Sequence, residues 1–216
     1  MTQELQIATF VCNFIEENCY VVSDATGEAV IIDCGAFAEA ERAEIAAYIE
    51  KHKLRVVHLL NTHGHFDHVF GVQWAADTFG LRPEMHVDEA WIYENAAQQM
   101  EQFLHRSFPL SLPPAAPGFR EGDSRSFGTH RLDIIHTPGH TPGGVCFYEA
   151  SGGVLFSGDS LFRRSIGRCD LPGGDWQALV GSLRAKVLTL PAEVCVYPGH
   201  GPATTVGEEA RSNPEL

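Results

Sequence analysis

Three histidines and one aspartate lie close together in a single short segment, Thr62-His63-Gly64-His65-Phe66-Asp67-His68. Imidazole nitrogen and carboxylate oxygen are ligands that suit zinc and iron, and a glycine between two of them lets the backbone bend tightly. A lone histidine is more often an ordinary surface or core residue. Four such side chains packed without a metal would leave several polar atoms poorly partnered, so the segment indicates a metal site.

The spacing His63-x-His65-x-Asp67-His68 resembles the H-x-H-x-D-H signature of the metallo-β-lactamase superfamily. The family pattern requires three more ligands, each directly after a strand. This chain supplies them in the right order, within His136-Thr-Pro-Gly-His140, Leu155-Phe-Ser-Gly-Asp159 and Val196-Tyr-Pro-Gly-His200. The resemblance covers most of the chain and is therefore far more specific than any single motif.

The resemblance implies two divalent metal ions, with zinc expected and iron or manganese as alternatives. It assigns His63, His65 and His140 to one ion and Asp67, His68 and His200 to the other, with Asp159 bridging both. Asp67 and Asp159 would thus take part in catalysis. Water must complete each coordination shell, and a bridging water with its pKa lowered to roughly 7 would provide hydroxide for hydrolysis of an activated acyl group.

Within the superfamily, the chain is most similar to the glyoxalase II branch of hydroxyacylglutathione hydrolases, in its short bacterial form. The similarity lies in Gly158-Asp159-Ser160-Leu161-Phe162, in residues 166–175 and in Pro198-Gly-His-Gly201. We therefore expect a thioesterase that acts on a small acyl-thioester by attack of a metal-bridging hydroxide. The exported β-lactamases, which often have Cys where Asp159 stands, fit less well.

One departure concerns recognition of glutathione. The typical glyoxalase II has an added helical C-terminal domain that binds glutathione, and this chain ends soon after His200. Arg168 is a candidate for binding a substrate carboxylate, and a salt bridge with Asp170 is the alternative role.

Two other classes of function remain open. A persulfide dioxygenase would use a single iron on His63, His140 and Asp159. These side chains belong to the ligand set of the two-metal hydrolase as well, so the sequence does not separate one metal from two. A non-catalytic binding protein of the same fold is the third class. Retaining open-site ligands without turnover would leave a costly buried polar cluster, which argues against it.

The elements that must position these residues follow from apolar periodicity. We expect strands at 5–11, 18–23, 28–32, 54–60, 83–87, 126–127, 131–136, 144–149, 154–156 and 194–197. We expect helices at 37–51, at 69–79 with Gly80 as its C-cap, at 88–106, and after the N-cap Asp175, whose apolar stripe includes Trp176. This order agrees with an α/β fold, the αββα sandwich of the family. We expect one domain over 1–216, with a lid insertion at about 88–120.

Asp33 follows the strand at 28–32. In the resembled family an aspartate here lies behind the metal ligands, where it would hydrogen-bond to a ligand histidine and fix its tautomer. A helix N-cap or turn residue is the equally open alternative.

Composition limits the partners. The formal net charge is −13, from 28 acidic and 15 basic residues, which argues against binding to nucleic acid or anionic lipid. A small-molecule substrate is expected, and oligomeric state is not indicated. The six cysteines are scattered, and from the sequence we expect neither a signal peptide nor a segment that crosses a bilayer. We expect free thiols and a cytoplasmic protein.

Overall fold

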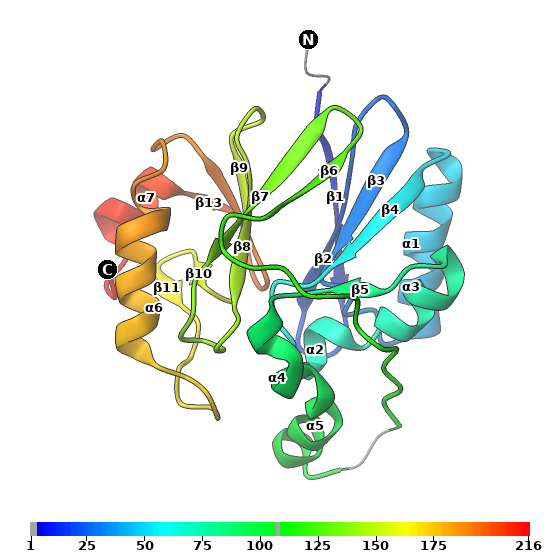
Figure 1. Cartoon of the computed structure of the whole chain (residues 1–216), viewed down its shortest axis with the longest axis horizontal. Coiled ribbons are helices and arrows are strands. Elements are labelled where there is room, and N and C mark those ends of the chain that lie inside the picture. Colours follow the sequence, from blue (N-terminus) through cyan, green and yellow to red (C-terminus); the bar gives the residue numbers. More distant parts are fainter. Residues whose placement is uncertain (1–3, 107–108) are drawn as a thin grey trace.

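Two β-sheets packed face to face form the centre of the computed structural model, which describes residues 4–106 and 109–216 (Figure 1). The first sheet has the order β1-β2-β3-β4-β5, with β1 Gln6–Cys12, β2 Glu17–Ser23, β3 Glu28–Ile32, β4 Arg55–Leu60 and β5 Pro83–Glu84. The second has the order β13-β12-β9-β8-β7-β6, with β6 Ser124–Phe127, β7 His130–His136, β8 Val145–Glu149, β9 Val154–Gly158, β12 Cys195–Pro198 and β13 Thr204–Thr205. A hairpin of β10 Leu161–Phe162 and β11 Ser165–Ile166 follows β9.

Helices cover the outer face of each sheet (Figure 1). On the first sheet lie α1 Glu39–Lys51, α2 Phe66–Val69 and α3 Val72–Phe79, and on the second lie α6 Trp176–Ser182, the π-helical turn Leu183–Val187 and α7 Val206–Ser212. A 3-10 turn, Val87–Glu89, leads into α4 Ala90–Glu94 and α5 Ala96–Leu104. In the described part of the chain, no helix has both the length and the apolar character needed to span a bilayer.

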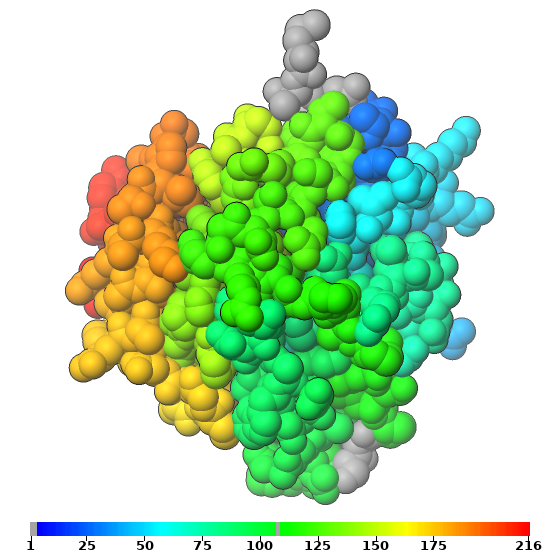
Figure 2. Space-filling model, in the orientation of Figure 1, coloured from blue at the N-terminus to red at the C-terminus, as the bar shows by residue number. Residues whose placement is uncertain are grey.

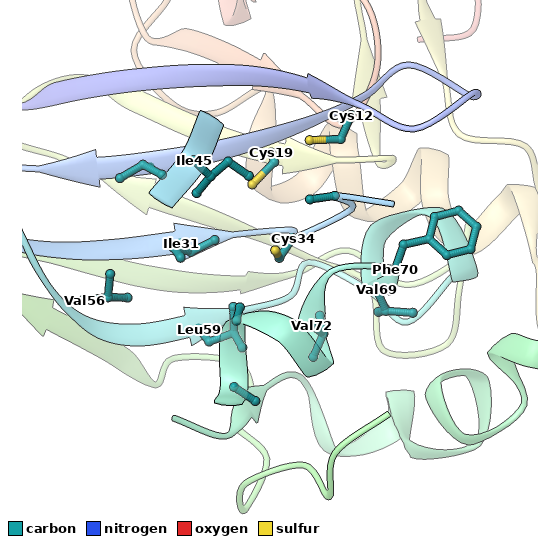
Figure 3. Close-up of a cluster of buried hydrophobic side chains, with 14 of the residues drawn as sticks. Cys12, Cys19, Ile31, Cys34, Ile45, Val56, Leu59, Val69, Phe70 and Val72 are labelled. Carbon is teal, nitrogen blue, oxygen red and sulfur yellow. The ribbon is translucent and has the colours of Figure 1, made fainter. Parts of the chain in front are cut away.

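Alternation along the strands produces three apolar layers. On β2, Cys19 and Val21 pack beneath α1 and α3, whereas Tyr20 and Val22 face the other sheet. Figure 3 shows the first of these clusters, in which Cys19 lies beside Ile45 of α1 and which also includes Cys12 and Cys34. Since successive strand residues point to opposite faces, strands buried on both sides need apolar residues at nearly every position. The predicted αββα sandwich is confirmed.

Several element boundaries differ from expectation. The helix predicted at 69–79 is two helices, and α2 already begins at Phe66, so Asp67 and His68 lie in a helical turn rather than a loop. The break falls at Gly71, whose N–H donates to the carbonyl of Cys34 (2.8 Å). A Cβ there would lie 2.8 Å from Cys34 Sγ, so the close approach needs glycine. Gly80 does end α3 in the left-handed conformation, with φ 68°.

The segment expected as one helix at 88–106 is also divided. The Asn95 side chain donates to the carbonyl of Trp91 (2.8 Å), and such local bonding competes with regular helix formation. The strand expected at 83–87 ends at Glu84, and the strand at 194–197 is followed by a further strand, β13. Trp176, placed in the apolar stripe of α6, is instead 49% exposed.

Candidate metal centre

The seven candidate ligands meet at one end of the sandwich. His63 and His65 follow β4, and Asp67 and His68 lie in α2. The other three residues follow strands of the second sheet: His140 follows β7, Asp159 follows β9 and His200 follows β12. Strands β3, β4 and β5 run parallel, as do β9 and β12. The carboxyl ends of parallel strands meet at one edge, which is why residues far apart in sequence converge.

The first group consists of His63, His65 and His140, whose potential ligand atoms lie within 4.8 Å of one another. His65 Nδ1 is 2.9 Å from His140 Nε2. Burial lowers the pKa of all three, well below the usual range for His63 and to about 3 for His65. These imidazoles are therefore neutral at pH 7, which is the form that binds metal.

The second group consists of Asp67, His68 and His200, also within 4.8 Å. His200 Nε2 lies 3.2 Å from Asp67 Oδ2. Burial by itself would lower the pKa of His68, but the carboxylates of Asp159, Asp67 and Asp33 raise it well above its usual value. This group differs from the first because it is built around negative charge.

Asp159 lies between the two groups. Its Oδ1 is 3.3 Å from His68 Nε2, and its Oδ2 is 3.6 Å from His140 Nε2 and 3.7 Å from His200 Nε2. Gly199 permits this placement, because a Cβ at that position would lie 2.2 Å from Asp159 Oδ1. The carboxylate is thus in reach of ions held by either group.

At the centre, buried His63 Nε2 has no hydrogen-bond partner, and His68 Nε2 and Asp159 Oδ1 face each other at 3.3 Å without forming a hydrogen bond. Leaving such atoms unsatisfied is costly, and a bound cation would satisfy all three. The donor set, imidazole nitrogen with carboxylate oxygen, is the one expected for zinc, iron or manganese. The residues present therefore fit the predicted pair of metal ions.

Backbone carbonyls and one aspartate orient the histidines from behind. His140 Nδ1 lies 2.7 Å from the carbonyl of Arg168, and His200 Nδ1 lies 3.2 Å from that of Ile15. A carbonyl can only accept, so Nδ1 carries the proton and Nε2 is free for a metal. Asp33, with φ 51°, accepts from Thr62 N (2.7 Å) and Thr62 Oγ1 (2.6 Å), and its Oδ2 lies 3.1 Å from His68 Nδ1.

Glu89 is a supporting residue that sequence reasoning did not identify. It is fully buried, and its two carboxylate oxygens accept from Gly64 N (2.8 Å) and Gly143 N (2.7 Å). One side chain thus joins the loop of His63 and His65 to the loop of His140. In the sequence Glu89 showed only as an acidic residue near a helix start.

Two further buried residues were also missed. Asn13 donates from Nδ2 to the carbonyls of Gly35 and Asp67, each at 3.0 Å, and so holds α2 against the loop after β3. Glu17 is fully buried with both carboxylate oxygens unpartnered, 3.9 Å from His68 Nδ1, and burial raises its pKa well above the usual range. No local pattern distinguishes either residue.

A cleft of about 500 Å³ opens at this centre. Besides five candidate ligands, it is lined by Ile15, Phe66, Trp91, Ile92, Asn95, Gln98, Gln99, Gln102, Phe103, Arg168, Leu171 and Pro172. Figure 2 shows the α4–α5 segment beside the segment around residue 170. The Arg168 side chain is 51% exposed and bonds Asp170 through Nε (2.7 Å) and an NH2 group (2.8 Å), so the salt bridge allowed by the sequence is formed.

His86, Asp88 and His136 form another group of potential ligands among the described residues. The rings of His86 and His136 are stacked, with centroids 4.1 Å apart and planes 12° apart. The lone pair of an imidazole lies in its ring plane, so nearly parallel stacked rings cannot both direct lone pairs at one ion. We therefore do not assign a metal to this group.

Comparison with known proteins shows the family and agrees with the fold. The model of the metallo-β-lactamase superfamily matches residues 13–200. Hydroxyacylglutathione hydrolase GloC of Haemophilus influenzae is 37% identical, over 93% of this chain and 93% of that protein. Two solved structures share the fold over 97% of this chain: BLEG-1 B3 metallo-β-lactamase (98% of its own chain, 37% identical, TM-score 0.88) and a di-iron-bound form of TTHA1623 (100%, 40% identical, TM-score 0.84).

Proposed function

The chain belongs to the metallo-β-lactamase superfamily, and from that premise we propose that it is a metal-dependent thioester hydrolase of the glyoxalase II type. The observation that carries the proposal is Asp159, placed between two groups of buried ligands whose inward atoms have no partner. The similarity to GloC supports a thioester as substrate.

We propose the seven residues as ligands, with Asp159 shared between two ions. When bound, the metals would supply an activated water at neutral pH and would polarise the acyl carbonyl. His63, His65 and His140 are kept neutral by burial, so they need not lose protons before binding. A thiolate leaves readily, so the chain needs no general acid beside the leaving group. The di-iron form of TTHA1623 supports iron as an alternative to zinc.

The insertion at 88–120 is proposed as a wall of the site within a single domain. Trp91 and Phe103 are 55% and 53% exposed, and both line the cleft. Substrate contact explains why large apolar side chains stand at the surface here. A cytoplasmic location is part of the same proposal, and it is supported by six free thiols.

The test is metal content measured together with turnover. Protein purified without added metal should contain about two zinc, iron or manganese ions per chain and should hydrolyse S-D-lactoylglutathione. Two ions without turnover of any thioester would contradict the thioesterase. Because BLEG-1 is similar over nearly the whole chain, a chromogenic cephalosporin should be assayed on the same sample. Turnover of the lactam alone would replace the thioester as substrate.

A mononuclear-iron persulfide dioxygenase is the second candidate, and similarity to the structure of ETHE1 from Myxococcus xanthus (25% identical over 97% of this chain, TM-score 0.78) favours testing it. Its ligands would be His63, His140 and Asp159. His65→Ala separates the candidates, because it should abolish hydrolysis by a site that needs both ions. Oxygen uptake on a persulfide that persists in the variant, with about one iron per chain, would favour the dioxygenase.

A further inference from the structure

The cleft wall formed by α5 carries a row of carboxamide side chains. Asn95, Gln98, Gln99 and Gln102 all line the cleft. Their spacing of three or four residues places them on one face of a helix. The opposite face presents Ala96 and Met100, which are buried in the core beside the first sheet. The helix therefore packs by its apolar face and turns its amides toward the substrate space.

From this row, and resting on the proposed thioester hydrolase, we propose that the thiol half of the substrate is an uncharged chain bearing secondary amides. A pantetheine-type arm has this chemistry, whereas a peptide thiol with free carboxylates does not. Carboxamides both donate and accept, so they match an amide N–H and C=O in pairs. They would leave a carboxylate without a charged partner.

Gln98 and Gln102 are the exposed members of the row, and both line the cleft. Gln99 is fixed in place, since its Nε2 donates to the carbonyl of Ile92 (2.7 Å) and its Oε1 is buried. The carboxamides of Gln98 and Gln102 are therefore the ones placed to donate to and accept from the amides of the thiol arm.

The charged residues that line the cleft also favour an uncharged thiol arm. Among the described residues that line it, Arg168 is the only arginine or lysine. One edge of its guanidinium, Nε and one NH2 group, is occupied by Asp170, at 2.7 and 2.8 Å. A substrate carboxylate would therefore share Arg168 with a carboxylate that already neutralises its charge. Trp91, Phe103 and Leu171 offer apolar contact to the methylene groups of an uncharged arm instead.

The test compares two thioesters that share one acyl group. On the metal-loaded protein, kcat/KM for S-D-lactoylpantetheine should exceed that for S-D-lactoylglutathione by about tenfold or more, as expected for one matched hydrogen bond and the absence of an unpaired carboxylate. A kcat/KM for the glutathione thioester that equals or exceeds that of the pantetheine thioester would overturn the inference and leave the hydrolase intact.

Gln98→Met, which keeps the length of the side chain and removes its amide, should raise KM for the pantetheine thioester about fivefold to tenfold with little change in kcat. The control is Gln73→Met on α3, outside the cleft, and thermal unfolding of both variants checks their fold. An unchanged KM in Gln98→Met would contradict the proposed contact. If neither thioester is hydrolysed, the proposed function fails, and calorimetry with pantetheine then decides: binding weakened in Gln98→Met supports the recognition, and equal or absent binding overturns it.

Discussion

The two ends of the β-sandwich differ in how their buried carboxylates and histidines are hydrogen-bonded. At the end away from the metal centre, Asp24 accepts from the N–H and hydroxyl of Thr26 and of Thr129. Glu149 at the same end contacts Ser151, Gly152 and His130. At the centre, by contrast, His63, His68 and Asp159 each have a buried atom with no partner.

The difference shows in proton affinity as well. Burial would raise the pKa of Asp24, but hydrogen bonds from Thr26 and Thr129 lower it below the usual value. At the centre, burial dominates and lowers the pKa of His63 and His65. The carboxylates of Asp24 and Glu149 are thus satisfied by donors of the protein itself and stabilise the fold. The candidate ligands would be satisfied by bound cations, and a site of this kind keeps open positions for substrate.

Asp159→Ala should have the largest effect, because it removes the carboxylate shared by the two ligand groups. We expect hydrolysis to fall by at least about a thousandfold. Metal content per chain should fall as well, whereas the circular dichroism of the protein should not change. Retention of both metals and of activity would show that the two groups work independently of this residue.

Metal removal should destabilise the protein, because the folded state then loses the free energy of metal binding at the candidate centre. At free metal a thousandfold above its dissociation constant, one site contributes about 4 kcal/mol, which corresponds to roughly 8–16 °C in thermal midpoint. Calorimetry before and after dialysis against a chelator measures the shift, and re-addition of zinc should reverse it. An unchanged midpoint would mean that the unpartnered atoms are not completed by metal.

Glu89→Gln tests the link between the two loops of the first group. Glutamine can accept only one of the two N–H groups of Gly64 and Gly143, and its own NH2 would face the other. We expect metal affinity to fall about tenfold to a hundredfold, with the loss confined to one of two sites in a titration. Asp88→Asn is the control, since the Asp88 side chain is 57% exposed. Equal loss at both sites would indicate a general defect in folding.

Asp24→Asn should affect stability and leave activity unchanged. We expect a loss of about 2 kcal/mol near pH 6, where the ionised carboxylate accepts its hydrogen bonds. Because the pKa of Asp24 is lowered in the folded state, its contribution is present above the unfolded value near 4 and is lost as pH falls through the folded value. Urea unfolding at pH 6 and pH 3 should therefore show a smaller difference between variant and wild type at pH 3.

The sequence by itself determined the strand and helix pattern and the motifs of the centre. Strand periodicity is local, and so are the cap at Gly80 and the spacing of His63, His65, Asp67 and His68. These features depend on residues a few positions apart and can be read locally, and the resemblance of the motifs to the family pattern then implied the αββα sandwich. Helix boundaries were predicted wrongly where a residue far along the chain sets them. At Gly71, for example, the N–H donates to the carbonyl of Cys34.

Only the tertiary structure decided what surrounds the candidate ligands. Glu89 contacts residues 25 and 54 positions away, and Asn13 reaches the carbonyl of Asp67 from 54 positions away. The carboxamide row on α5 is visible as spacing, but its orientation toward the cleft follows from the packing of Ala96 and Met100. Hydrogen bonds across such separations depend on how the sheets and loops pack. The local periodicity of the sequence therefore does not predict them.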